Sequence, residues 1–184
     1  MDVPEEKKDG ARSDRSDVLL TPGSGLFPVT RSILSAEALL EEVAHAYAMD
    51  TPVTCQLLRQ GLNDTYLLTT RDDRYIVRVY GACRRSPSDI SYELELLTNL
   101  TAKGVSVSMP IAGKDGALTR PLPAPEGSRQ LVLFTYAEGT PLSWDKENHS
   151  YLAGRMAATI HAASDDFVSR HRSEERRVGK ECRL

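Results

Sequence analysis

Apolar residues of the chain recur first at helical spacing and then at strand spacing. After Ser35, a residue type that commonly caps helices, they lie three and four positions apart and so share one face of a helix. These residues are Leu39, Leu40, Val43, Ala44 and Tyr47. The helix is expected to end near residues 50–52, where Asp, Thr and Pro follow one another.

Three strand-like stretches follow this helix. Apolar and polar residues alternate at 53–57, residues 61–64 have turn composition, and residues 65–70 are again rich in β-formers, a pattern that predicts a hairpin. Residues 75–80 form the strongest strand of the sequence, because they are apolar on both faces except at Arg78. We therefore expect this third strand to lie in the centre of a sheet.

A second helix is predicted to run from Ser86 to residue 104. Ser86, Pro87 and Asp89 have the spacing of an amino-terminal capping box with proline in the first turn. Glu93 falls within the apolar face of this helix, whereas Glu95 lies on the opposite, solvated side. The apolar face comprises Ile90, Leu94, Leu96, Leu97 and Leu100.

The remaining elements complete a mixed α and β pattern. They are a short extended piece at 105–111, a second hairpin formed by 118–123 and 130–136, and a helix at 145–163. This last helix carries Leu152, Met156 and Ile160 on one side. The order helix, three strands, helix, two strands, helix indicates an α+β fold.

Composition and charge narrow the class of protein. The 184 residues are 40% hydrophobic and 27% charged, with a formal net charge of −3, and no apolar run reaches the roughly 18 residues of a membrane span. Residues 1–17 lack the apolar core of a secretory signal, and the basic residues form no long stripe outside the last dozen positions. Cys55, Cys83 and Cys182 have neither disulfide-framework nor zinc-site spacing. We expect a globular cytoplasmic protein that binds neither membranes nor nucleic acid; its oligomeric state stays open.

Two charged residues stand where the apolar pattern predicts the core. Arg78 lies in the central strand and Glu93 on the buried face of the next helix, and each would be costly to bury alone. We expect the two side chains to meet as an ion pair. Protein kinases use such a pair to hold a cation against nucleotide phosphates. The alternatives are a salt bridge without a ligand, or an Arg78 that reaches out to a sheet edge.

Two flanking features fit a nucleotide site. The turn around Gly61 joins the two strands before Arg78, so its backbone N–H groups could cover phosphates, although residues 61–64 would equally make an ordinary hairpin turn. The strand at 130–134 stops abruptly at the small and turn-forming residues 135–139, in the form of an interlobe hinge. Backbone groups freed there could bond an adenine edge.

Taken in order, these motifs resemble the aminoglycoside phosphotransferase and choline-kinase-like family of small-molecule kinases. The resemblance runs from about residue 34 to residue 167. It rests on residues 61–66, 75–81, 105–110, 133–139 and 157–163, with Glu93, Leu97 and Leu100 between them. The family implies a protein-kinase-like amino-terminal lobe, which is a five-stranded antiparallel sheet with one helix packed on it. An extra helix would precede this lobe, and the start of a helical second lobe would follow it.

The resemblance also implies a role for each candidate residue. Arg78 would contact the ATP phosphates, and Glu93 would orient Arg78. The residues implied for phosphate cover are Gly61, Asn63 and Thr65, and those implied for the adenine hinge are Phe134, Thr135, Tyr136 and Ala137. The implied cofactors are ATP and Mg²⁺, and the implied acceptor is a hydroxyl of a small molecule of the aminoglycoside, homoserine or choline type. His161 would be a packing residue of the second lobe.

The sequence departs from the family after the last predicted helix. The H-x-D-x-x-x-x-N catalytic loop and the later metal-binding Asp are absent, and residues 172–183 match a translated sequencing adapter. We therefore predict a disordered leader at 1–24, a kinase-like lobe at 25–138, a hinge and first helix of a truncated second lobe at 139–171, and a foreign tail at 172–184. Such a kinase fragment would be inactive. A non-catalytic nucleotide-binding or interaction module and a purely structural α+β domain are the alternatives.

Overall fold

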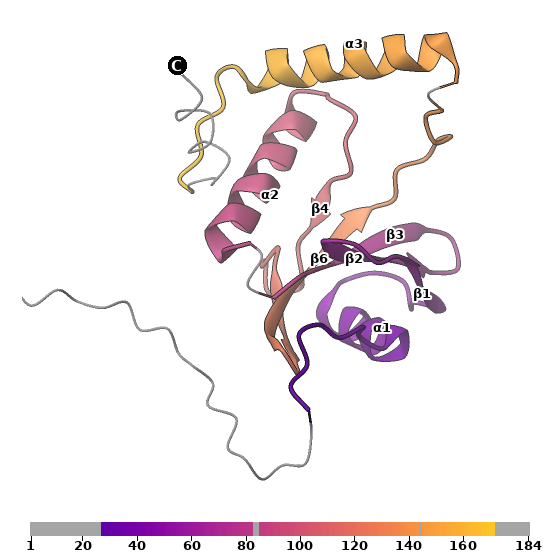
Figure 1. Ribbon diagram of the computed structural model, residues 1–184, viewed down its shortest axis with the longest axis vertical. Helices are drawn as coiled ribbons and strands as arrows, with labels where there is room; N and C mark the ends of the chain where they lie inside the picture. The colour runs from indigo at the N-terminus through magenta and orange to yellow at the C-terminus, as the bar shows by residue number, and fades with distance from the viewer. Residues whose placement is uncertain (1–26, 83–84, 144, 172–184) are drawn as a thin grey trace, which may run out of the picture.

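The computed structural model describes residues 27–82, 85–143 and 145–171, so the predicted leader at 1–24 and the predicted tail at 172–184 lie outside the described residues. Within these ranges the chain forms three helices and six strands. They are α1 (Ala36–Ala46), β1 (Thr54–Arg59), β2 (Asn63–Thr69), β3 (Arg74–Tyr80), α2 (Pro87–Ala102), β4 (Pro110–Ile111), β5 (Arg120–Ala124), β6 (Gly127–Thr135) and α3 (Glu147–Ser164). Figure 1 shows the sheet between α1 and α2, with α3 crossing the end of α2.

The strands form one antiparallel sheet in the order β1-β2-β3-β6-β4, and β5 pairs with β6 as a hairpin. The α+β fold and the central position of β3 are confirmed. The five expected strands all form, but the extended piece at 105–111 adds a sixth, because Pro110 and Ile111 pair with Phe134 and Leu133 of β6. This two-residue strand is too short for an alternating sequence pattern to reveal.

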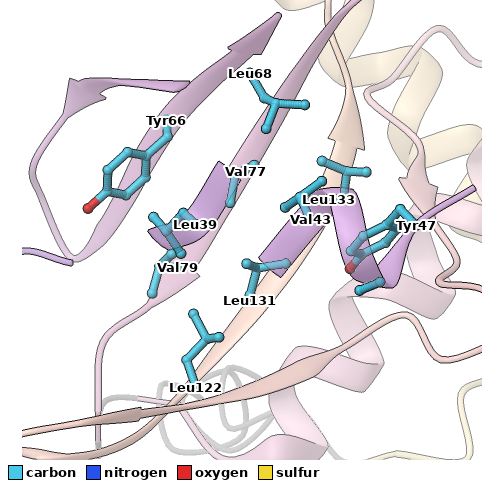
Figure 2. Close-up of a cluster of buried hydrophobic side chains, with 11 residues drawn as sticks. Leu39, Val43, Tyr47, Tyr66, Leu68, Val77, Val79, Leu122, Leu131 and Leu133 are labelled. Carbon is cyan, nitrogen blue, oxygen red and sulfur yellow. The ribbon is translucent and has the colours of Figure 1, made fainter. Parts of the chain in front are cut away.

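The first hydrophobic core lies between α1 and the sheet. Figure 2 shows Leu39 of α1 beside Val77 and Val79 of β3, and Val43 beside Leu133 of β6. The other buried members of this cluster are Ala46, Tyr47, Tyr66, Leu68, Leu122 and Leu131. The predicted apolar stripe of the first helix therefore faces the sheet, and Ser35 caps the helix by accepting a hydrogen bond from the backbone N–H of Ala38.

The second core lies on the opposite face of the sheet, beneath α2. Tyr80, Val132 and Phe134 of the sheet pack there against Ile90 and Leu94 of the helix. Because side chains of a strand alternate between its two faces, Arg78 lies on this second face, between Val77 and Val79 of the first core. The alternation in β3 thus turns Arg78 toward α2.

The capping box of α2 is confirmed. The Ser86 hydroxyl accepts a hydrogen bond from the backbone N–H of Asp89 at 3.1 Å, and the Asp89 carboxylate accepts one from the N–H of Ser86, also at 3.1 Å. These bonds satisfy two donors that a helix start would otherwise leave unpaired. They fix the start of the helix that carries Glu93.

The last helix, α3, packs against α2 and exposes much of its surface. The segment after α3 runs back along α2, where the rings of Phe167 and Tyr92 meet edge to face with centroids 5.6 Å apart. Leu152 and Met156 are each 43% exposed. His161, predicted to be a packing residue, is also exposed, because within the described chain no element covers that side of α3.

Candidate functional site

The register of three neighbouring strands aligns polar side chains beneath α2. Thr65 of β2 pairs with Arg78 of β3, and Arg59 of β1 pairs with Thr65. Directly paired residues project from the same face of a sheet, so these side chains form one row across the three strands. Arg59 joins the row because the β1–β2 register shifts between Leu57 and Arg59.

Arg78 and Glu93 form the predicted ion pair. Arg78 Nη1 donates to Glu93 Oε1 at 2.7 Å, and the side chains are 32% and 25% exposed. The pair is half-buried rather than enclosed in the core, so one side of the guanidinium remains accessible. Glu93 is shared, because its Oε2 lies 3.4 Å from Nη1 of Arg85.

An aromatic ring supports the same guanidinium from the sheet. The Cζ atom of Arg78 lies 4.8 Å from the ring centroid of Phe134, a geometry that favours a cation–π interaction. Tyr80 lies next to the pair, and burial together with the charge of Glu93 raises the pKa of its phenol to about 12. The environment of Arg78 therefore holds one carboxylate, a neutral phenol and an aromatic face.

A cavity of about 540 Å³ opens above this pair. Five of the predicted site residues line it: Gly61, Asn63, Thr65, Arg78 and Glu93. It also contains Arg59, Arg85 and Asp89, which sequence reasoning did not assign to a site. Three arginines against two carboxylates make the lining net positive, which suits an anionic ligand.

The turn between β1 and β2 forms one wall of this cavity. Gly61 does not adopt the positive φ that only glycine tolerates easily, and a Cβ atom at Gly61 would meet nothing closer than the backbone oxygen of Asn63 at 3.6 Å. The backbone therefore does not require glycine at this position. What its missing side chain provides is open space beside the cavity, where a ligand could approach the turn.

The four residues predicted for the adenine hinge do not line this cavity. Phe134 is buried at the end of β6, and the N–H of Thr135 donates to the carbonyl of Met109 at 2.9 Å, so it is used within the sheet. The Cζ atom of Arg74 lies 4.2 Å from the ring centroid of Tyr136, so the guanidinium covers this ring. Thr135 pairs with Tyr75, three residues before Arg78 on β3, so about 10 Å of strand separates this pairing position from the backbone of Arg78.

The two missed arginines differ in how far the sequence could have revealed them. Arg85 directly precedes the capping Ser86, so a helix start beside a predicted anion site was a signal for it. Arg59 had no such signal, since the register shift that turns it toward Thr65 appears only when β1 and β2 pair. In the described part of the chain, no three His, Cys, Asp or Glu side chains gather as a metal site.

Comparison with known proteins identifies the family to which this lobe belongs. Residues 54–181 match the model of the phosphotransferase enzyme family. The chain belongs to this family. The matched residues include 172–181, within the segment predicted to be foreign, so that boundary stays a prediction.

Over residues 27–82, 85–143 and 145–171, this phosphotransferase-family chain has no helix long and apolar enough to cross a membrane.

Relatives of this phosphotransferase-family chain include uncharacterised proteins and homoserine kinases. It is 35% identical to an uncharacterised protein of Deinococcus radiodurans, over 86% of this chain and 46% of that protein. It is 36% identical to an uncharacterised protein of Synechocystis, over 83% of this chain and 43% of the relative. The homoserine kinase of Neisseria meningitidis is 30% identical, over 66% of this chain and 38% of the enzyme. The chain thus spans less than half the length of these relatives.

Solved structures share the fold at low sequence identity. An amicoumacin kinase in complex with AMP-PNP and Ca²⁺ superposes with a TM-score of 0.63 at 21% identity, over 74% of this chain and 42% of that one. A microcompartment-associated aminopropanol kinase superposes with a TM-score of 0.60 at 23% identity, over 72% of this chain and 42% of that one. The architecture of the sheet and of α2 is therefore the one found in small-molecule kinases.

Proposed function

We propose that this chain is the nucleotide-binding part of a kinase that transfers the γ-phosphoryl group of ATP to a hydroxyl of a small molecule. The observation that carries the proposal is the Arg78–Glu93 ion pair on the floor of a net-positive cavity, with Nη1 of Arg78 2.7 Å from Oε1 of Glu93. Family membership supports phosphoryl transfer by the parent protein, and the homoserine kinases among its relatives favour a small metabolite as acceptor.

In this proposal each wall of the cavity has its own task. Arg78 neutralises phosphate charge, and Glu93 holds its guanidinium in place through one oxygen. The turn that contains Gly61 and the strand that begins at Asn63 cover the phosphates from above. The end of β6 at Phe134 and Thr135, with Tyr136 and Ala137 after it, would receive the adenine. The backbone spacing of about 10 Å along β3 between the Thr135 pairing position and Arg78 is compatible with a nucleotide that spans the two.

The described residues fit ATP better than they fit its metal. Asp89 and Glu93 are the carboxylates of the cavity, and both are engaged, Asp89 by Ser86 and Glu93 by Arg78. They do not form a magnesium site, so no step is assigned to Mg²⁺ here.

Because the sequence contains no H-x-D-x-x-x-x-N element, we expect this chain to bind ATP without transferring its phosphoryl group. Reading the source DNA across residues 170–184 tests whether a catalytic loop follows.

Replacing Arg78 by Met tests the nucleotide site. A charged hydrogen bond is worth about 1.5–3 kcal/mol, so ATP affinity measured by calorimetry should fall about 10- to 100-fold while the variant stays folded. Arg120→Met is a matched control, since Arg120 is a partly buried, ion-paired arginine of the same sheet that does not line the cavity. Its ATP affinity should equal that of the unmodified chain.

Two outcomes of this experiment would contradict the proposal. Unchanged ATP binding in the Arg78→Met variant would make the Arg78–Glu93 pair a structural salt bridge of an α+β domain. Phosphoryl transfer by the unmodified chain, abolished by a substitution within it, would contradict the expected inactivity.

A further inference from the structure

A second pair of opposite charges lies on the other face of the sheet, behind the nucleotide site. Asp64 Oδ2 accepts a hydrogen bond from Nη2 of Arg129 at 2.7 Å, and both side chains are fully buried. The two residues come from different strands and are 65 positions apart in the sequence. A buried ion pair contributes little net stability compared with apolar packing, although removing one of its partners is costly.

Arg129 uses its remaining donors to hold three parts of the chain together. The Nε atom donates to the carbonyl of Tyr80 at 3.0 Å, and Nη2 donates to the carbonyl of Val79 at 3.2 Å as well as to Asp64. The Nη1 atom donates to the carbonyl of Ser32 at 3.0 Å. The guanidinium thus ties β6 to the end of β3 and to the segment before α1. Because its planar fork has fixed directions, these bonds fix where Asp64 can lie.

Arg31 binds the other oxygen of Asp64. Its Nη2 donates to Asp64 Oδ1 from a side chain that is 36% exposed. The next residue, Ser32, donates from its hydroxyl to Glu126 at 2.7 Å. The segment before α1 therefore supplies the hydrogen bond to the second carboxylate oxygen of Asp64, from the solvent side.

Asp64 is the neighbour of two residues of the nucleotide cavity. Along β2, Asn63 and Thr65 face that cavity, whereas Asp64 faces the opposite side of the sheet. The turn before them has little packing of its own, since Leu62 is 72% exposed. Leu62 also lines a second cavity of about 250 Å³ above Arg31 and Arg129, so the turn stands between two open spaces.

We infer that Asp64 is a positioning residue, clamped by Arg129 and Arg31, that holds the β1–β2 turn over Arg78. The inference rests on the proposed nucleotide site. Where packing is sparse, the direction in which a strand starts depends on the bonds of its first residues. The β2–β3 ladder pairs Asn63 with Tyr80 and Thr65 with Arg78, and Asp64 adds side-chain bonds from behind that keep Asn63 and Thr65 in front. The segment before α1 is thereby coupled to the nucleotide site through Arg31.

Arg31→Met is the gentle test, because it removes one partner of Asp64 and leaves the buried pair intact. Asp64→Asn is the stronger test, because it retains the shape and removes the charge. Arg120→Met again serves as control for the loss of a partly exposed, ion-paired arginine. The measurements are hydrogen exchange of the backbone at 61–65 and at the centre of β6, and the affinity for ATP.

We expect Arg31→Met to raise hydrogen exchange at 61–65 and to weaken ATP binding about fivefold, while exchange at the centre of β6 stays unchanged. The Arg120→Met control should match the unmodified chain in both measurements. Asp64→Asn should have larger effects in the same direction; if it fails to fold, Arg31→Met decides. Variants that unfold more easily but keep the control's ATP affinity and its exchange at 61–65 would overturn the positioning role. If the unmodified chain binds no ATP, the proposed function fails, and exchange at 61–65 alone decides the role of Asp64.

Discussion

Arg78 lies over the ring of Phe134, 4.8 Å from the ring centroid, while it donates to Glu93 at 2.7 Å. The guanidinium of Arg78 therefore contacts β6, the strand that leads to the predicted hinge, and α2, the helix that carries Glu93. Such a cation has little freedom to turn toward the sheet edge. The ion pair and the aromatic face together hold it at the cavity.

A double-mutant cycle between Arg78 and Phe134 should reveal a favourable coupling. A cation–π contact at a half-exposed site is worth about 0.5–1 kcal/mol beyond packing. Arg78→Met, Phe134→Leu and the double variant should therefore be non-additive by about that amount in the free energy of unfolding, measured with urea. Strict additivity would show that the ring and the cation are neighbours without interaction.

Arg59 and Arg85 should contribute to nucleotide affinity less than Arg78 does. Both line the cavity, but Arg85 is 44% exposed and Arg59 is also exposed, so solvent and salt screen their charges. Replacing either by Gln should weaken ATP binding about fivefold at low salt, the equivalent of about 1 kcal/mol, and less at high salt. Calorimetry at the two salt concentrations measures this, and an effect that does not depend on salt would contradict the screened role.

Glu126 should make stability depend on pH in the acid range. Burial raises the pKa of this carboxyl, but hydrogen bonds from the Ser32 hydroxyl and N–H, with the charge of Arg129, outweigh burial and hold it below the usual 4.5. A carboxyl whose pKa is lowered by folding stabilises the folded chain at pH values above its pKa in the unfolded chain. This contribution disappears as the pH falls through the pKa of the carboxyl in the folded chain.

The stability difference between the unmodified chain and a Glu126→Gln variant measures that contribution. It should be full at neutral pH and should shrink as the pH drops below about 4.5. Ser32→Ala should reduce the difference, because it removes one of the hydrogen bonds that lower the pKa. A difference that stays constant across the acid range would contradict this role of Glu126.

Cys55 should react slowly with alkylating reagents in the folded chain. Burial, and to a smaller extent the charge of Glu37, raises the pKa of its thiol from 9.0 to about 11, and only the thiolate is nucleophilic. Below pH 9 its alkylation should be about 100-fold slower than in denaturant, when followed by mass spectrometry of the peptide that contains Cys55. Equal rates in the two states would show that partial burial in β1 does not raise the pKa of this thiol.

The sequence alone determined the three described helices, five of the six described strands and the first ion pair. Apolar residues at helical spacing located α1, Ser86 and Asp89 located the start of α2, and the run that contains Arg78 located β3. The Arg78–Glu93 pair was predictable because two charges in apolar positions of consecutive elements must compensate each other. Such signals are local: each is read within one or two elements.

Only the tertiary structure decided how the site is assembled and supported. Arg59 joined the cavity through a register shift, β4 formed because β6 had a free edge, and Asp64 found Arg129 across 65 residues of sequence. In the sequence Asp64 belongs to a turn, and nothing marks its partner. Pairing over such distances depends on which strands become neighbours, and that depends on the packing of the whole sheet between α1 and α2.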